Sequence, residues 1–436
     1  MKYKIAVLFA FALLLLNGKA NAQEVLTLEE AIRITLERNY DIKLVANNLE
    51  ISRNNVTTGN AGMLPVVTAN VAQNNTVQNR SENRESGQVI ERTGARGNTL
   101  NYGVGLNWTV FDGFGMFARY EQLKELEKLG EANLKQTILT RIADVTSVYY
   151  NLVQQQQQLN ALDTAMVISR ERVGTAQNRF EIGKASRLEV LNAQVDLNTD
   201  TTNILRQREL YQNTQTQLNE LMARDASIRF RVADEITIDD QLNLAELSER
   251  ATQQNPSLQA ALINKRVAEL DLKQVRANRL PTVTLNSGYN FNRSESALGF
   301  TTLATGRGLN YGITASVPIF NGFEQRRNQQ NANINISSAQ LEFERLNQTI
   351  NTQLTTAYNT YLTSLSLVNL EGKNQEIAKR NLEITMEKFR IGSITPIEFR
   401  EAQLNYVNAT VRYSNAQYLA KLAEVSLKEI AGALTF

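Results

Sequence analysis

The sequence contains no cysteine and no histidine. The absence of cysteine excludes disulfides, thiolate nucleophiles, iron–sulfur clusters and lipid attachment through a cysteine. The absence of histidine removes the commonest general base and the commonest zinc ligand. Most hydrolase, oxidoreductase and metalloenzyme mechanisms therefore lose a required side chain, although catalysis by carboxylates or lysine remains open. We expect no enzyme, and no catalytic, cofactor-binding or metal-binding residues.

An excess of charge of one sign is also missing. Lys and Arg number 46 and Asp and Glu number 44, which gives a formal net charge of +2 over 436 residues. Nucleic-acid-binding proteins usually carry a strong basic excess, so we expect no nucleic-acid partner. No stretch beyond the first residues approaches the roughly 20 apolar residues of a spanning helix, so the mature chain is predicted to have no transmembrane helix.

The first 22 residues predict a cleavable secretory signal. Lys2 and Lys4 precede an apolar run from Ile5 to Leu16, and the segment ends on Ala20-Asn21-Ala22. A basic start, a short apolar core and an Ala-x-Ala ending are typical of a signal peptide. The alternative, an N-terminal membrane anchor, requires a longer apolar run. We expect cleavage after Ala22, so that the mature chain begins at Gln23.

The rest of the chain consists of two tandem repeats. Leu64-Pro65 recurs 216 residues later as Leu280-Pro281, and Phe111-Asp112-Gly113-Phe114 recurs 209 residues later as Phe320-Asn321-Gly322-Phe323. The offset of 209 then holds for more than 100 residues, which coincidental similarity would not do. We predict a first repeat over residues 23–230 and a second over residues 231–436.

Each repeat is predicted to begin with a helix that breaks once and resumes. Thr27 and Asn243 are suitable N-caps and each is followed three residues later by a glutamate. The breaks are expected near Asn39 and Asn255. The resumed helices are expected to run to the Leu-Pro pairs, where Pro65 and Pro281 stop them and favour an extended continuation.

Period-two alternation follows and predicts a pair of strands in each repeat. Apolar residues occupy every second position in Leu100–Val110 and Leu309–Val317, and the pattern is similar in Val283–Phe291. Strands of about 9–11 residues with one apolar face suit an outer-membrane β-barrel, and also a half-buried strand of a soluble sandwich. The polar segments between the strands, residues 73–98 and 292–307, are predicted to be exposed loops.

Very long helices come next in each repeat, over about residues 115–160 and 324–368. Apolar residues recur at three-four spacing typical of coiled-coil packing, as in Ile138, Ile142, Val145, Tyr149, Leu152 and in Ile350, Leu354, Ala357, Tyr361, Leu365. The run Gln154–Gln158 is interpreted as a solvated helix face. Turns are predicted near residues 160–164 and 371–374, after which the chain returns as helix.

The returning helices contain a duplicated break. Gly183 and Gly392 suit left-handed C-terminal caps. Ser186 with Glu189, and Thr395 with Glu398, form capping-box patterns. Capping explains both glutamates, and catalytic use is the weaker alternative.

One chain supplies four strands, whereas membrane barrels have at least about eight, and an open sheet edge cannot face lipid. The chain must therefore assemble with copies of itself, as a dimer with eight strands or a trimer with twelve.

The chain resembles the TolC-type outer-membrane efflux channels over essentially all its mature length. The resemblance is carried by the duplicated Leu-Pro, the duplicated Phe-(Asp/Asn)-Gly-Phe and the duplicated Phe-x-x-Gly-x-x-(Ser/Thr)-x-x-Glu that ends on Glu189 and Glu398. It implies a mainly α protein with a membrane β part, in which each repeat combines a β-hairpin with long coiled-coil helices.

The resemblance further implies a homotrimer in outer-membrane lipid, with a twelve-stranded β-barrel continued by an α-helical barrel in the periplasm. Its implied function is a passive exit duct of a tripartite efflux or type I secretion system. A periplasmic adaptor protein and an inner-membrane pump would be its partners.

In this family charged residues near the second helical tip close the tunnel. The matching candidates are Glu371, Glu376, Arg380 and Glu383, together with Lys373 and Lys379. Arg380 stands where the family pattern has an acidic residue, which puts a simple acidic ring in doubt. The two alternatives are ion pairs between neighbouring helices that hold the tips shut and an ordinary charged helix end.

Two other classes of function stay open at this point. One is a periplasmic or surface coiled-coil structural or adaptor protein. The other is a secreted carboxylate enzyme, whose nearest candidate pair is Asp239-Asp240. The exported substrate and the type of pump are not encoded in any feature of this sequence.

Overall fold

The computed structural model describes residues 25–83, 85–233, 235–296 and 301–434. The predicted signal peptide, residues 1–22, lies outside the described residues. The chain divides into two compact units. Unit 1 comprises residues up to 46, residues 133–258 and residues from 346 onwards, and unit 2 comprises residues 47–132 and 259–345. Each unit therefore draws on both predicted repeats, whose boundary at residues 230 and 231 stays a prediction.

Most of the chain is helical. Unit 1 holds α2 (Leu28–Arg38), α5 (Arg187–Leu221), α6 (Leu244–Gln254) and α9 (Pro396–Ile430), with the parallel pair β1 (Val25–Leu26) and β4 (Arg231–Val232). Unit 2 holds β2 (Val66–Asn83), β3 (Val89–Asp112), β5 (Thr282–Ser296) and β6 (Leu303–Ser316). Four helices have residues in both units: α3 (Tyr40–Asn55), α4 (Gly115–Glu181), α7 (Pro256–Ala277) and α8 (Glu324–Arg390). None of these described helices is both long and apolar enough to span a membrane.

The predicted starts and breaks of the first helices are confirmed. Thr27 caps α2 by accepting a hydrogen bond from the Glu30 N–H, and Asn243 caps α6 by accepting one from Ala245. Asn39 separates α2 from α3, and Asn255 separates α6 from α7.

The two asparagines at these breaks make the same contacts. The Asn39 amide donates to the Leu221 carbonyl at 2.8 Å, and its oxygen accepts from the N–H groups of Asp41 and Ile42. The Asn255 amide donates to the Ile430 carbonyl at 2.9 Å, and its oxygen accepts from Ser257 and Leu258. Both side chains are buried and each ties a helix break to the end of a returning helix, so the repeat extends to individual hydrogen bonds.

The resumed helices end earlier than the sequence predicts. Helix α3 ends at Asn55 and α7 ends at Ala277, so neither reaches its proline. In the first repeat the Asn60 side chain donates to the Asn55 carbonyl at 2.9 Å, which offers the helix end a competing partner. Pro65 and Pro281 instead directly precede β2 and β5.

Helices α4 and α8 are longer than predicted, with 67 residues each. At 1.5 Å per residue each is about 100 Å long. The turns predicted near residues 160–164 and 371–374 are wrong, because the helices continue to Glu181 and Arg390. Polar residues without proline do not stop a helix, and even Gly372 stays helical since a single interior glycine costs only about 1 kcal/mol.

The core of unit 1 follows the predicted three-four spacing. Val145, Leu152 and Leu218 are fully buried in one cluster, and their equivalents 209 residues later, Leu354, Tyr361 and Leu427, are buried in a second cluster. The glutamine run was misread in part. Gln154 and Gln155 are buried, and their amides donate to Asn415 and Thr214 respectively.

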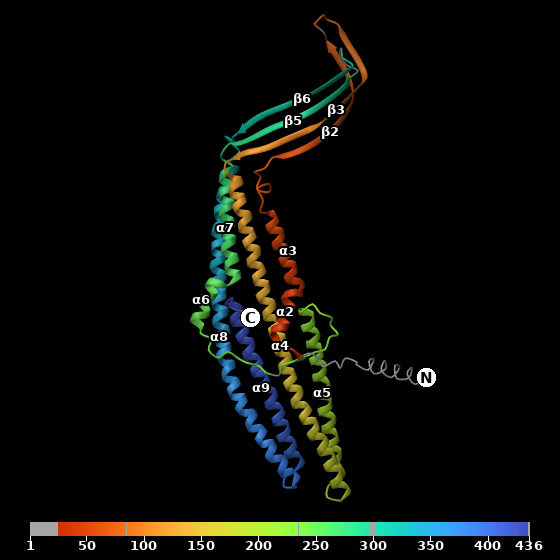
Figure 1. Ribbon diagram of the computed structural model, residues 1–436, viewed down its shortest axis with the longest axis vertical. Helices are drawn as coiled ribbons and strands as arrows, with labels where there is room; N and C mark the ends of the chain where they lie inside the picture. The colour runs from red at the N-terminus through yellow and green to blue at the C-terminus, as the bar shows by residue number, and fades with distance from the viewer. Residues whose placement is uncertain (1–24, 84, 234, 297–300, 435–436) are drawn as a thin grey trace, which may run out of the picture. The chain divides into compact units, whose positions relative to one another are not determined.

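The sheet of unit 2 has four antiparallel strands in the order β2-β3-β5-β6 (Figure 1). Its strands extend into the segments predicted to be loops, so that only residues 84–88 separate β2 from β3 and residues 297–302 separate β5 from β6. Backbone ladders need no apolar side chains, and polar pairs such as Asn292 donating to Asn101 bridge the strands. The polar composition was therefore a poor guide to where these strands end.

The strand register also obeys the repeat. Val66 pairs with Asn107 in the first hairpin. Adding 216 and 209 to these two numbers gives Thr282 and Ser316, which pair with each other in the second hairpin. The two hairpins therefore have the same register, and the sequence offsets can be used to transfer contacts from one repeat to the other.

Candidate functional site: the helical hairpin turns

Two helical hairpins of unit 1 end in equivalent turns. In Figure 1 the end of α4 lies beside the start of α5, and the end of α8 beside the start of α9. Gly183 and Gly392, predicted as left-handed caps, have φ angles of 74° and 78°. The N–H groups of Lys184 and Gly183 donate to the carbonyls of Arg179 and Phe180. These two backbone hydrogen bonds together form a Schellman motif. The chain reverses direction at this motif.

The second turn has the same backbone hydrogen bonds. Ser393 donates to the Lys388 carbonyl at 2.9 Å and Gly392 donates to the Phe389 carbonyl at 3.0 Å. The left-handed backbone conformation costs a residue with a Cβ about 1–2 kcal/mol, so both turns favour glycine at this position.

Both returning helices are capped at the predicted residues, but only the second has the complete capping box that the sequence predicts. Ser186 accepts from the Glu189 N–H at the start of α5. Thr395 accepts from the Glu398 N–H at 3.3 Å, and the Glu398 carboxylate accepts from the Thr395 N–H at 2.9 Å. Both glutamates lie in first turns, where the helix dipole also favours a negative charge.

Large apolar side chains are exposed at both turns. Ile182 is 67% exposed and its equivalent Ile391 is 79% exposed. Leu188 and its equivalent Ile397 are 65% and 79% exposed. Water-exposed apolar residues that gather at one place mark a contact surface more often than scattered ones do. We call Ile182, Leu188, Ile391 and Ile397 the turn surface.

A buried ionic cluster lies close to the turns in the chain and joins α4, α5 and α9. The Arg400 guanidinium donates to both carboxylate oxygens of Asp200, at 2.8 and 2.9 Å. Ser169 donates to Asp200 at 2.6 Å. Arg172 pairs with Asp196. The side chains of Arg172 and Asp200 are 5% exposed. The Arg400 cluster consists of Ser169, Arg172, Asp196, Asp200, Arg400 and Gln403.

Gln403 extends the hydrogen bonds of the cluster, although the buried Nη1 of Arg172 has no hydrogen-bond partner among the described residues. Buried Gln403 donates to the Ala165 carbonyl at 2.8 Å and to Ser169 at 3.0 Å, and its oxygen accepts from Arg400 at 3.1 Å. Burial lowers the pKa of Arg400, but the hydrogen bonds and charge of Asp200 outweigh it and the pKa is raised. The guanidinium therefore stays charged, and its bidentate ion pair with Asp200 holds α9 against α5.

A groove of about 380 Å³ adjoins the cluster. Arg172, Asp196 and Arg400 line it beside Leu188, Phe389 and Ile397. Charged groups of the cluster and apolar residues of the turn surface therefore share one concave face. Such a mixed lining suits a protein segment better than a small charged solute.

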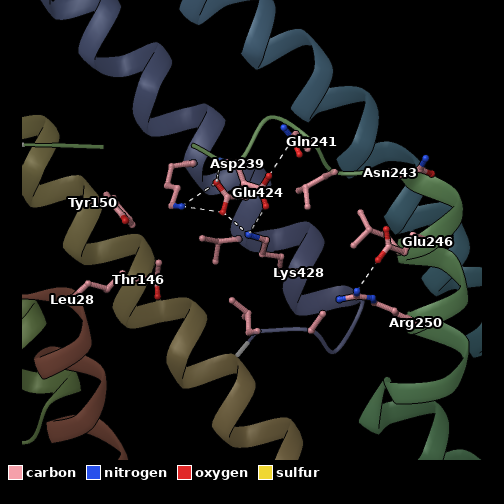
Figure 2. A pocket seen from close by; sticks show the side chains of 16 residues that line it. Leu28, Thr146, Tyr150, Asp239, Gln241, Asn243, Glu246, Arg250, Glu424 and Lys428 are labelled. Carbon is pink, nitrogen blue, oxygen red and sulfur yellow. Dashed lines mark hydrogen bonds and ion pairs between the residues drawn. The ribbon is translucent and has the colours of Figure 1, made fainter. Parts of the chain in front are cut away.

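A second hollow of unit 1, of about 570 Å³, is lined in part by the segment that joins the repeats (Figure 2). Glu424 is 3% exposed and accepts from Lys421, from Lys428 and from the Asp239 N–H. Lys428 also donates to the Asp239 carboxylate at 3.1 Å.

The pair Asp239-Asp240 is the nearest candidate for carboxylate catalysis, and the contacts of Asp239 show a structural role. The N–H of Gln241 and then Lys428 lower the pKa of its carboxyl. Figure 2 shows Asp239, Glu424 and Lys428 turned toward one another. Asp239 thus fastens the segment between the repeats to α9. Among the described residues, no group of three or more Asp or Glu is arranged to hold a metal ion.

The predicted gate residues lie inside α8 and not at a turn. Glu371 accepts from Arg412 of α9 at 3.1 Å, and exposed Arg380 pairs with Glu376 one turn earlier on the same helix. Glu383 is exposed. They lie away from the turn at Gly392 because the sequence predicts that turn too early, at residues 371–374. Their role in a gate stays a prediction.

Sequence reasoning missed the Arg400 cluster. Asp196 and Asp200 are four residues apart on one helix, where like charges normally repel. That spacing was a usable signal that a cation from elsewhere lies between them.

Solved structures of outer-membrane channels share this fold. The CmeC channel of Campylobacter jejuni has a TM-score of 0.76 and 20% sequence identity, covering 93% of this chain and 85% of that one. The MtrE channel of Neisseria gonorrhoeae, in its open state, has a TM-score of 0.73 and 16% identity, covering 94% and 89%. The fold of this chain, with its duplicated hairpins, is therefore that of solved outer-membrane channels.

Sequence comparison identifies the family. The outer membrane efflux protein family matches residues 31–224 and 247–433. The outer membrane protein TolC of Vibrio cholerae is 24% identical over 310 residues, which cover 70% of this chain and 69% of that protein. TolC of Escherichia coli is 21% identical over 363 residues, covering 79% and 71%. The chain belongs to the outer membrane efflux protein family, and the resemblance predicted from its motifs is confirmed. It is an outer-membrane exit duct of an efflux system.

Proposed function

We propose that the chain works as a homotrimer whose twelve strands form a β-barrel in outer-membrane lipid, continued by an α-helical barrel in the periplasm. The observation that carries this proposal is the open sheet. Strands β2 and β6 are its two edges, each with neighbouring strands on one side only. In lipid every backbone polar group needs a partner, so edges must be closed by another copy. Three copies give twelve strands, which leave room for a passage.

The duct would conduct passively and take its substrate from other proteins. No catalytic arrangement is needed for this role, and the polar residues described above serve capping and packing. We propose that a periplasmic adaptor protein, coupled to an inner-membrane pump, docks at the turn surface. Exposed Ile182, Leu188, Ile391 and Ile397 would supply its apolar contacts.

Reconstitution tests the channel. Protein purified in detergent should have three times the monomer mass by light scattering, and should give stable single-channel currents in planar bilayers. Folded trimers that stay electrically silent would contradict the function. Release of the protein from cell envelopes by high salt without detergent would contradict the barrel.

The docking surface has its own test. Ile391→Ser with Ile397→Ser should reduce recovery of the cognate adaptor with the purified duct at least tenfold, while bilayer currents persist. Leu341→Ser is the matched control, since Leu341 is 62% exposed on α8 but belongs to unit 2. Equal recovery with all variants would remove the turn surface from the docking site.

We propose further that the charges of α8 restrict the passage. Neutralising Arg380 and Glu383 together as Arg380→Gln and Glu383→Gln should raise single-channel conductance, because ion pairs to neighbouring helices would be lost. Neutralising Glu371 or Glu376 should act in the same direction. Unchanged conductance in planar bilayers would count against a gate at these four residues.

A further inference from the structure

Long stretches of the two edge strands of the sheet carry none of the usual protection against pairing. Every residue of β2 and of β6 is exposed. Residues 66–79 and 308–316 contain neither a proline nor a charged residue. Exposed edges of this length that stay unpaired normally carry lysine, proline or inward charges. Both edges are therefore built to receive a strand.

The chain itself contains a copy of the missing junction. The pairing of β3 with β5 joins the hairpin of the first repeat to the hairpin of the second. By the repeat offsets, β6 corresponds to β3 shifted by 209, and β2 corresponds to β5 shifted by 216. The strand starts support this, since Pro65-x-Val67-Thr68-x-Asn70 recurs as Pro281-x-Val283-Thr284-x-Asn286. A junction between β6 and β2 should therefore repeat the β3–β5 register.

We propose that β6 pairs antiparallel with β2 of a second copy of this chain, with Ala315 opposite Val71 and Leu309 opposite Val77. Leu106 pairs with Ser287, and 106 + 209 = 315 while 287 − 216 = 71. Leu100 pairs with Arg293, and the same sums give 309 and 77. The ladder runs over residues 308–316 of one copy and 70–78 of the next. This register rests on the proposed trimer and specifies how its copies meet.

Side-chain chemistry supports the register independently. It sets apolar Leu309 against Val77 and Ala315 against Val71 on one face. Asn310 lies opposite Thr76 on the other face. A slip by one residue would place the two apolar faces on opposite sides of the sheet, because side chains alternate with period two. A slip by two residues keeps the faces together, and only the β3–β5 junction excludes it.

The two junctions differ at one aromatic pair. Tyr102 stacks on Phe291 across β3 and β5, with ring centroids 4.8 Å apart and planes at 7°. The equivalent positions between copies are Tyr311 and Asn75. The junction between copies therefore lacks this stack. Asn75→Phe should restore it and raise the temperature at which the trimer dissociates in dodecyl sulfate. Asn74→Phe, on the other face, is the control and should not.

Disulfide trapping tests the register directly, because the chain has no cysteine of its own. Residues directly opposite on antiparallel strands have Cα atoms about 4.5–5.5 Å apart, within disulfide reach. Diagonal neighbours two residues along are about 7–8 Å apart and beyond it. The test variant combines Val71→Cys with Ala315→Cys. The controls combine Ala315→Cys with Ala69→Cys or with Gln73→Cys. Leu106→Cys with Ser287→Cys reports trapping within one chain.

Under mild oxidation the test variant should give covalent trimers on a denaturing gel, and both controls should stay monomeric. If a control pair is trapped, the register is wrong but the trimer stands. The same holds if no pair is trapped while light scattering finds trimers. Failure of all three pairs in protein that light scattering finds monomeric overturns the trimer and the register together. A trimer whose melting is raised by Asn74→Phe and not by Asn75→Phe also overturns the register.

Discussion

The Arg400 cluster gives the sharpest prediction about the helical hairpins. Arg400→Gln removes two charge-assisted hydrogen bonds, of 2.8 and 2.9 Å, from the Asp200 carboxylate. Ser169 remains as a donor, but the Asp200 side chain is only 5% exposed and loses its counter-charge. Removing one partner of a buried pair costs about 3–5 kcal/mol. We expect local opening of α5 and α9 around these residues to become roughly 10²- to 5 × 10³-fold more frequent.

Hydrogen–deuterium exchange of the amides near Asp200 and Arg400 measures this opening, because local unfolding exposes them to solvent. Arg412→Gln is the matched control. Arg412 also joins α9 to another helix, through Glu371 at 3.1 Å, but its side chain is 53% exposed. Exposed pairs contribute about 0–1 kcal/mol, so exchange near Arg412 should change by less than about fivefold.

The double variant Asp200→Leu with Arg400→Met completes the test. Replacing both members of a buried pair by apolar residues is often neutral, so protection should return toward that of the unaltered chain. Exchange in Arg400→Gln no faster than in Arg412→Gln would refute the assignment of the cluster as the link between α5 and α9. A double variant less protected than Arg400→Gln would refute the electrostatic explanation.

Three further predictions concern stability. Asn255→Ala leaves the Ile430 carbonyl and two N–H groups without their partner and should cost about 1–3 kcal/mol in urea unfolding followed by circular dichroism; a smaller cost than that of the exposed cap variant Asn243→Ala would contradict it. Gly392→Ala forces alanine to a φ of 78° and should lower the free energy of unfolding by about 1–2 kcal/mol. Gly174→Ala lies inside α4, where a Cβ meets nothing within 4 Å, and should stabilise the protein. Destabilisation by both variants would refute the backbone argument. Burial raises the pKa of Glu429 above its ordinary 4.5, so the contribution of Glu429 to stability is fully present below pH 4.5 and is lost as pH rises through the raised pKa. The melting temperature of Glu429→Gln, relative to that of the unaltered chain, should therefore increase between pH 4 and pH 7. A difference that stays constant over this range would contradict the prediction.

Much of the fold could be predicted because its determinants are local or repeated. The caps at Thr27, Asn243 and Thr395 depend on residues two or three positions apart, and these are visible in any sequence. The duplication showed which segments are equivalent before any contact was known. The buried positions of α4 and α8 followed from three-four spacing alone.

The errors came from features that local patterns do not determine. Residues 160–164 and 371–374 are polar, but nothing in them ends a helix, whereas the left-handed glycines at 183 and 392 do. Polar strand ends looked like loops because a ladder of backbone hydrogen bonds leaves no apolar pattern. The Arg400 cluster joins residues up to 234 positions apart, such as Ser169 and Gln403. Only packing of the hairpins brings such residues together.

The β3–β5 junction also sets an order in which the sheet forms. Within each hairpin the strands are separated by a few residues, and hairpins of this kind close in about 1–10 μs. The β3–β5 pairs join residues as far apart as Gly97 and Ser296, so they form only after the intervening helices have brought the repeats together. That step is still intramolecular and independent of protein concentration. In the proposed trimer, closure between copies is the one step whose rate depends on concentration, so dilution during refolding should accumulate chains with complete four-stranded sheets and open edges.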